Sequence, residues 1–221
     1  MTDSVYPTLT QEAIEAAAIR LLRDYEASTD GQVSAPIPVE LIAERFLGYR
    51  IDITDQGLFA DPDYLGGVDF DSKTILVNSS VEGHEGRYAF TIAHELGHHV
   101  LHREHYQQQK QGSQAQIMCR SKGKRPMIEY QADRFAAALL MPAVPLAIAA
   151  RALKAKSLGP RRLQRLATLL ITEGGFSNVS HEAMRYRLLE LKLGGSSLAV
   201  PRLLYVPSVW AYRLLRRWLR A

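Results

Sequence analysis

Hydrophobic residues recur at helical spacing in several parts of the chain. A period of three to four residues places them on one face, which predicts amphipathic helices that pack on a core. The clearest of these segments are residues 11–25, 39–46, 86–102, 127–141, 163–171 and 181–191. Thr10 and Ser180 precede two of the helices and are typical N-caps, and Pro142 should end the helix at 127–141.

Between residues 49 and 78 the pattern changes to alternation of apolar and polar positions. Residues 49–53, 67–70 and 74–78 are each typical of a short strand. Residues 103–125 are rich in Gln, Lys and Arg and cannot supply a core, so we predict a long loop there. The order of elements predicts an α+β fold with a small three-stranded sheet, followed by a helical region. We expect domains at residues 1–145 and 146–200 and a C-terminal tail at 201–221.

One short motif inside a predicted helix carries metal chemistry. His94 and His98 are four residues apart, so both imidazoles lie on one helix face and can bind one ion. Glu95 lies one step around the helix and can act as general base toward a water that zinc activates. The alternative is three polar residues on an exposed face. The apolar flanks favour a buried helix, where unpaired His and Glu side chains are costly.

A catalytic zinc ion usually has three protein ligands and one open position. Glu104 and His105 follow His98 too closely along the chain to be favoured. Glu129 opens the next long helix, and Asp133 follows it by one turn. We expect Glu129 to be the third ligand and Asp133 to hydrogen-bond the outer nitrogen of a ligand histidine. The alternative is that Glu129 and Asp133 form a solvated acidic pair.

Two segments resemble the ImmA/IrrE-type zinc metallopeptidases. Residues 87–98 resemble the active-site helix of that family, and residues 129–142 resemble its second signature. The resemblance covers roughly residues 36–193. It implies a zincin-like arrangement of active-site helices, a helix-turn-helix-like region after it, and one Zn²⁺ per chain. It also implies a cytoplasmic endopeptidase that cleaves a partner transcriptional repressor, a small helix-turn-helix protein, after a stress or DNA-damage signal.

The sequence departs from that family at two points. Gln131 stands where a Glu is common, which we expect to be harmless because Gln131 is not a proposed ligand. The loop before Glu129 is longer than usual, which bears on the geometry of the third ligand. We also expect an extended substrate to add to the edge of the predicted strand at residues 74–78.

Charge is distributed unevenly along the chain. Residues 1–100 hold 6 Lys/Arg and 17 Asp/Glu, and residues 101–221 hold 21 Lys/Arg and 6 Asp/Glu, within a net charge of +4. The basic half suits a polyanionic partner, or else the two halves neutralise each other. Candidates for phosphate contact, including single-stranded DNA, are Arg120, Lys122, Lys124, Arg125, Arg161, Arg162, Arg165, Arg185 and Arg187. For the basic amphipathic tail, docking on the acidic half is the preferred interpretation over a membrane surface.

The chain has a single cysteine and begins without the basic and apolar regions of a signal peptide. One cysteine excludes an internal disulfide, and no apolar run is long enough to cross a bilayer, so we expect a cytoplasmic protein. Cys119 lies in a basic segment ten residues before Glu129. A thiolate there could bind the zinc ion as an inhibitory fourth ligand, a cysteine switch. The alternative is an incidental thiol.

The cysteine switch is supported by a resemblance to the CapP peptidases of antiphage (CBASS) operons. That resemblance implies pairing with a small repressor and activation by single-stranded DNA. A second functional hypothesis stays open at this point. The chain could be a DNA-binding transcriptional regulator with a structural or degenerate zinc site, which Glu95→Gln would leave unaffected.

Overall fold

The computed structural model of the chain describes residues 6–29, 31–109, 118–119, 126–153, 156 and 161–193. It divides into two compact units. The first unit comprises residues 1–31 and 38–139, and the second comprises residues 32–37 and 140–221. Compactness does not show which parts fold independently, so the domain limits derived from the sequence stay predictions.

The first unit contains a small mixed sheet. The three predicted strands are present as β1 (Arg50–Thr54), β2 (Gly66–Asp69) and β3 (Thr74–Asn78). β3 pairs with β1 in parallel and with β2 antiparallel, and a two-residue strand, β4 (Met118–Cys119), adds antiparallel to β2. The strand order is therefore β1-β3-β2-β4.

This order corrects one expectation about substrate binding. β3 is bonded on both sides, so an extended substrate has no open edge there. The sequence pattern shows that a segment is a strand, but it does not show which strands flank it. The strand on the far side of β2 from β3 is β4, in which Cys119 pairs with Gly67 and Met118 pairs with Val68.

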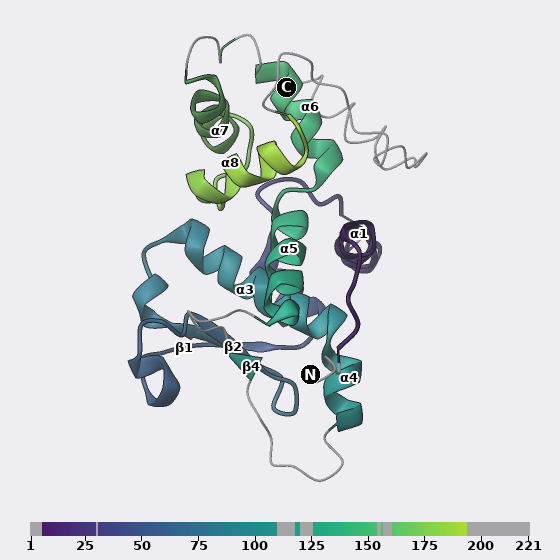
Figure 1. Cartoon of the computed structure of the whole chain (residues 1–221), viewed down its shortest axis with the longest axis vertical. Helices are drawn as coiled ribbons and strands as arrows, with labels where there is room; N and C mark the ends of the chain where they lie inside the picture. The colour runs from purple at the N-terminus through teal and green to yellow at the C-terminus, as the bar shows by residue number, and fades with distance from the viewer. Residues whose placement is uncertain are drawn as a thin grey trace. The chain divides into compact units, whose positions relative to one another are not determined.

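Two long helices of the first unit build the layer above the sheet, and one of them packs on the strands. α3 (Glu85–Leu101) packs on β2 and β3 and also contacts α1 (Gln11–Thr29). α5 (Met127–Leu140) crosses α3 (Figure 1). Ile92, Ala93 and Leu96 of α3 are fully buried, and burying a side chain such as Ile or Leu is worth roughly 1.5–3 kcal/mol. This apolar face holds α3 in place above the sheet.

Shorter helical segments complete the first unit. They are α2 (Val39–Leu41), the π-helix η1 (Ile42–Phe46), the 3₁₀ turns η2 (Gly57–Ala60) and η3 (Ser79–Val81), and α4 (Arg103–Gln109). α4 corrects the prediction that residues 103–125 form a loop throughout. Its polar residues have good helix propensity, and α4 starts directly after α3, so a helix forms without an apolar face of its own.

The second unit, as far as it is described, is helical. It contains α6 (Ala143–Leu153), α7 (Arg162–Thr172) and α8 (His181–Glu190), and α7 packs against both of the others. The Ser180 hydroxyl accepts a hydrogen bond from the amide of Ala183 and caps α8, as predicted. Gly175 has a φ of 85° in the turn between α7 and α8, a conformation that favours glycine. The helix-turn-helix interpretation of this region stays a prediction.

Within the part of the chain that the structure describes, no single helix is long and apolar enough to span a membrane. α5 and α6 would be long and apolar enough only if taken together as one bent pair.

Candidate metal centre

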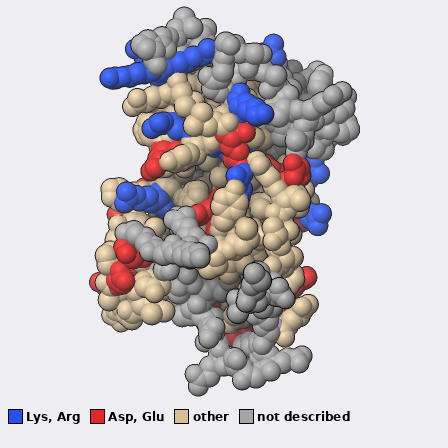
Figure 2. Space-filling view, viewed as in Figure 1, with Lys and Arg blue, Asp and Glu red and all other residues tan. Residues whose placement is uncertain are grey.

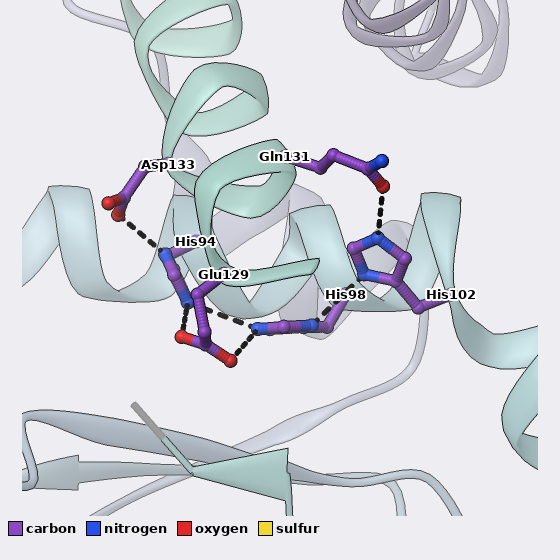
Figure 3. A network of polar contacts seen from close by, with 6 residues as sticks. All are labelled: His94, His98, His102, Glu129, Gln131 and Asp133. Atoms are coloured by element: carbon purple, nitrogen blue, oxygen red, sulfur yellow. Dashed lines mark hydrogen bonds and ion pairs between the residues drawn. The ribbon is translucent and has the colours of Figure 1, made fainter. Parts of the chain in front are cut away.

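The site is built first from one face of α3. His94 and His98 lie one turn apart on this helix, and both are almost completely buried. Their Nε2 atoms are 3.1 Å apart (Figure 3). The helical spacing of four residues therefore brings the two imidazoles together, as the motif predicts.

Glu129, near the start of α5, completes the cluster. Its Oε2 lies 3.2 Å from Nε2 of His94, and its Oε1 lies 3.3 Å from Nε2 of His98. One ligand atom from each of the three residues falls within 4.8 Å of the others. Glu129 is 6% exposed, so a solvated acidic pair does not describe it.

These distances fit a metal ion. Bonds of about 2.0–2.1 Å at tetrahedral angles hold zinc ligand atoms about 3.3 Å apart. The three separations in the cluster are 3.1, 3.2 and 3.3 Å. Two imidazoles and one carboxylate are also the donor set of many catalytic zinc sites. His94, His98 and Glu129 would thus hold the ion, and the cluster is typical of zinc metallopeptidases.

The outer nitrogen of His94 has a partner on α5. Nδ1 of His94 lies 2.9 Å from Oδ1 of Asp133, one turn after Glu129 (Figure 3). An ionised carboxylate only accepts, so the imidazole donates through Nδ1–H. In neutral His94 the lone pair is then on Nε2 and faces the centre of the cluster. This is the contact expected for Asp133 from the sequence, and its effect on metal affinity stays a prediction.

The electrostatics of the cluster call for a positive charge at its centre. Burial alone would lower the pKa of His94, but hydrogen bonds to Asp133 and Glu129 and the charge of Glu95 raise it to about 9. Burial alone would raise the pKa of Glu129, but its close contacts with His94 and His98 hold it well below its usual range. Without a metal, a proton on His94 supplies the charge that a cation would otherwise bring.

His98 and His102 stay neutral for a different reason. Burial lowers the pKa of His98 below its ordinary value, against the effect of Glu129. Burial also lowers the pKa of His102, to about 4. A neutral His98 keeps a lone pair, which a metal ligand requires.

Glu95 lies on the same buried stretch of α3 and is 0% exposed. Gly66 of β2 provides the space for its carboxylate. A Cβ atom at Gly66 would lie 2.9 Å from Oε1 of Glu95 and 2.4 Å from Cγ2 of Thr91. Glu95 also raises the pKa of His94 by its charge, which places it near the cluster. A carboxylate beside the metal centre is where a general base must be.

Gly97 allows α5 to reach the site. A Cβ atom there would lie 3.1 Å from Cα of Ala132 and 3.2 Å from Cδ1 of Phe135. Such distances are tighter than ordinary contacts, so the two helices approach closely only because residue 97 lacks a side chain. Glu129 and Asp133 flank Ala132 on α5, and the close approach brings both to the histidines of α3.

A second set of polar contacts, which the sequence did not lead us to expect, joins α3 and His102 directly after it to α5. Nδ1 of His98 lies 3.0 Å from Nδ1 of His102, and Nε2 of His102 lies 2.9 Å from Oε1 of Gln131 (Figure 3). The amide nitrogen of Gln131 donates to the carbonyl of Pro7 at 2.9 Å. The spacing of four residues between His98 and His102 was the available signal.

Several predicted residues lie outside the described part of the chain or away from the cluster. Arg120, Lys122, Lys124 and Arg125 lie outside the described residues, and Cys119 is described only by its backbone in β4. In the second unit, Arg161, Arg165 and Arg185 are exposed and Arg162 is half-buried. Figure 2 shows exposed Lys and Arg side chains on the face of that unit turned to the viewer.

The prediction that Arg187 contacts phosphate is wrong, because its side chain is buried. It is 1% exposed, its Nε donates to the carbonyl of Met141 at 3.1 Å, and its Nη1 lies 3.0 Å from Oε2 of Glu190. Helical spacing places Arg187 on the buried face of α8, whereas its charge suggested an exposed position. The guanidinium is buried despite its charge because the protein supplies it with hydrogen-bond acceptors.

Comparison with known families agrees with this geometry. The family model of the IrrE N-terminal-like domain, a peptidase family, matches residues 47–189, which is well over half of the chain. The chain belongs to this family. It is a zinc metallopeptidase by its family and by the buried cluster of His94, His98 and Glu129. No curated protein matches the chain.

The matched range includes every residue of the IrrE-like metal centre. β1 to β4, α3, α5 and all three ligand candidates fall within residues 47–189, whereas α1 and Pro7 precede the range. The family model therefore does not include the contact between Gln131 and Pro7.

Proposed function

We propose that the chain is a cytoplasmic zinc-dependent endopeptidase that cleaves a partner transcriptional repressor, a small helix-turn-helix protein, after a stress or DNA-damage signal. The observation that carries this proposal is the buried cluster, whose ligand atoms are spaced as around one zinc ion. Membership of the IrrE-like peptidase family supports hydrolysis of a protein.

The residues of the chain divide the chemistry among them. A zinc ion held by His94, His98 and Glu129 would polarise a peptide carbonyl and activate water. Glu95 takes a proton from the attacking water and passes it to the leaving amine. The carboxylate of Asp133 orients His94 through its Nδ1–H. Burial of Glu95 keeps its carboxylate away from bulk water, which strengthens its effect on the reacting atoms.

An extended substrate would bind along β2. An added strand there would be hydrogen-bonded to the backbone and would run beside Gly66, the residue that borders Glu95. β4 now pairs with this side of β2, with Cys119 opposite Gly67. We therefore propose that residues 118–119 block the substrate position and that Cys119 acts as an inhibitory fourth zinc ligand until a signal displaces them.

The signal in this proposal is single-stranded DNA. The basic candidates Arg120, Lys122, Lys124 and Arg125 flank or follow β4, so binding of a polyanion there would act on the blocking strand directly. Exposed Arg161 and Arg165 on the second unit support contact with a polyanion. The resemblance to CapP peptidases supports the further proposal that such a system belongs to an antiphage (CBASS) operon.

The proposal is tested by incubating the purified chain with the repressor encoded beside it, with and without single-stranded DNA. Wild type should cleave the repressor only with DNA, because β4 and Cys119 otherwise occupy the site. Glu95→Gln should retain zinc and lose at least about 100-fold in cleavage rate, since it removes the general base. Cys119→Ala should cleave without DNA.

Each variant separates one part of the proposal from the rest. Cleavage by Glu95→Gln at the wild-type rate would show that Glu95 is not the base. A Cys119→Ala protein that still requires DNA would remove the cysteine switch but not the peptidase. Tight, sequence-dependent binding of duplex DNA that is unaffected by Glu95→Gln, without any cleavage, would favour a DNA-binding regulator.

A further inference from the structure

We propose that His102 and Gln131 fix the tautomer of His98, so that its Nε2 atom is left with the lone pair that binds the metal. Three hydrogen-bonding side chains, His98, His102 and Gln131, lead away from the metal centre (Figure 3). The last of them, Gln131, donates to the backbone carbonyl of Pro7. We refer to these three side chains as the relay. The inference rests on the proposed zinc site and assigns a positioning role to two residues that are not ligands.

The carbonyl of Pro7, at the far end of the relay, determines which atom donates in each hydrogen bond. The Pro7 carbonyl can only accept, so Gln131 must turn its amide nitrogen toward it at 2.9 Å. Oε1 of Gln131 then faces His102 and can only accept, so Nε2 of His102 carries a hydrogen and donates at 2.9 Å. The remaining nitrogen of a neutral His102, Nδ1, is an acceptor.

The same logic fixes His98. Because Nδ1 of His102 accepts, Nδ1 of His98 must carry the hydrogen and donate across the 3.0 Å between them. Nε2 of His98 is left without a hydrogen and faces Glu129 and His94. A ring nitrogen binds a metal only through a lone pair, so the relay prepares His98 for ligation before any ion arrives.

Burial makes the relay difficult to replace by water. His98 and Gln131 are 1% exposed and His102 is 0% exposed. If His98 adopted the other tautomer, the Nδ1 atoms of His98 and His102 would face each other as two acceptors, away from solvent. Buried polar groups without partners are strongly disfavoured, so donation from Nδ1 of His98 to Nδ1 of His102 is the stable arrangement.

An amide suits position 131 better than a carboxylate in this chain. Gln131 donates to Pro7 and accepts from His102 at the same time. A carboxylate could accept from His102 but would present a second oxygen to the Pro7 carbonyl, acceptor against acceptor. The two ligand histidines therefore have different supports from α5, a carboxylate at Asp133 for His94 and an amide at Gln131 for His98.

The test compares zinc affinity in four purified variants by competition with a chelator at one pH. Gln131→Met keeps the length of the side chain and removes both hydrogen bonds, and His102→Phe removes the acceptor for His98. Both should bind Zn²⁺ about 10–100-fold more weakly than wild type. Gln131→Glu keeps the acceptor for His102 and should fall between Gln131→Met and wild type. Ile92→Val, a buried change on α3 outside the relay, should stay within about twofold of wild type.

A second measurement reads the tautomer directly. Nitrogen-15 NMR of the imidazoles in the zinc-free protein should show His98 protonated at Nδ1 in wild type, with the form protonated at Nε2 appearing in Gln131→Met. Gln131→Met retains the His102 side chain. It therefore tests the relay even if His102→Phe does not fold. Unchanged zinc affinity together with an unchanged His98 tautomer in Gln131→Met would overturn the relay. A wild-type protein that takes up no zinc would instead overturn the proposed function.

Discussion

Oε1 of Glu95 lies 2.9 Å from the point where a side chain at Gly66 would begin. The carboxylate of the proposed base thus occupies space that β2 leaves open by having no Cβ atom there. Thr91, one turn before Glu95 on α3, is closer still, at 2.4 Å from the same point. The glycine in β2 therefore leaves the room that the Glu95 carboxylate needs.

Gly66→Ala should impair catalysis more than it impairs metal binding. The added methyl group must displace Thr91 and Glu95. None of the three ligands is among the nearest neighbours of that methyl position. We expect the rate of repressor cleavage, measured with single-stranded DNA present, to fall at least about tenfold, since general-base catalysis depends on position. Zinc content should stay near one per chain.

Gly31→Ala is the matched control for that prediction. A Cβ atom at Gly31 would lie 3.6 Å from Oγ1 of Thr29, an ordinary contact distance. Gly31→Ala should cleave the repressor at the wild-type rate in the same assay. If Gly66→Ala is as active as the control, the position of Glu95 does not depend on β2.

Zinc affinity should rise with pH. The pKa of His94 is raised to about 9 in the metal-free protein, so below that pH His94 carries a proton that the ion must displace. The pKa values of His98 and Glu129 are lowered, so neither adds a proton near neutral pH. The dissociation constant should fall about tenfold per pH unit below about pH 9 and level off above it.

Calorimetric titration with zinc in two buffers of different ionisation heat checks this sign and magnitude. Near pH 7.5, roughly one proton should be released for each zinc ion bound. Release of no proton would show that His94 is neutral before the ion binds.

Asp133→Asn should weaken zinc binding without abolishing it. Asn can still accept the hydrogen bond from Nδ1–H of His94, but the charge that increases the basicity of this imidazole is lost. We expect about tenfold lower affinity in the chelator assay. Asp52→Asn removes a half-buried carboxylate that pairs with Arg50 on β1, away from the metal centre, and should leave zinc affinity unchanged. Equal affinities of the two variants would contradict the role of Asp133.

Arg187→Ala should destabilise the chain, whereas Arg185→Ala should not. Loss of Arg187 leaves the buried carbonyl of Met141 without its donor and Glu190 without its ion pair, which we expect to cost about 2–4 kcal/mol. Arg185 is exposed, and its loss should change stability by less than about 0.5 kcal/mol. Urea unfolding followed by circular dichroism measures the difference, and similar midpoints for the two variants would contradict it.

Local periodicity predicted the elements of this chain well because each signal is carried by neighbouring residues. The helices that carry His94 and Glu129 and the strands β1 to β3 were all visible from spacing alone. The pairing of β4 with β2 was not, because the register of a two-residue strand depends on partners distant in the sequence. The α4 helix was missed because it has no apolar face to reveal it.

The candidate site shows the same division. His94, Glu95 and His98 follow from one motif, and Glu129 and Asp133 follow from helical spacing on a second segment. The roles of Gly66 and Gln131 could not be deduced in the same way. Gly66 matters through a distance across to Glu95, and Gln131 through a bond to Pro7, 124 positions earlier in the chain. Both depend on how remote parts of the chain meet.

The close approach at Gly97 bears on attempts to build such a site elsewhere. A protein engineer who inserted the five residues from His94 to His98 into another helix would obtain two aligned imidazoles and a carboxylate. The insertion would still lack a neighbouring helix as close as α5. In this chain, Cα of Ala132 lies 3.1 Å from the position that a Cβ atom at Gly97 would take. Transplantation would therefore need both helices, with their small residues face to face, as one module.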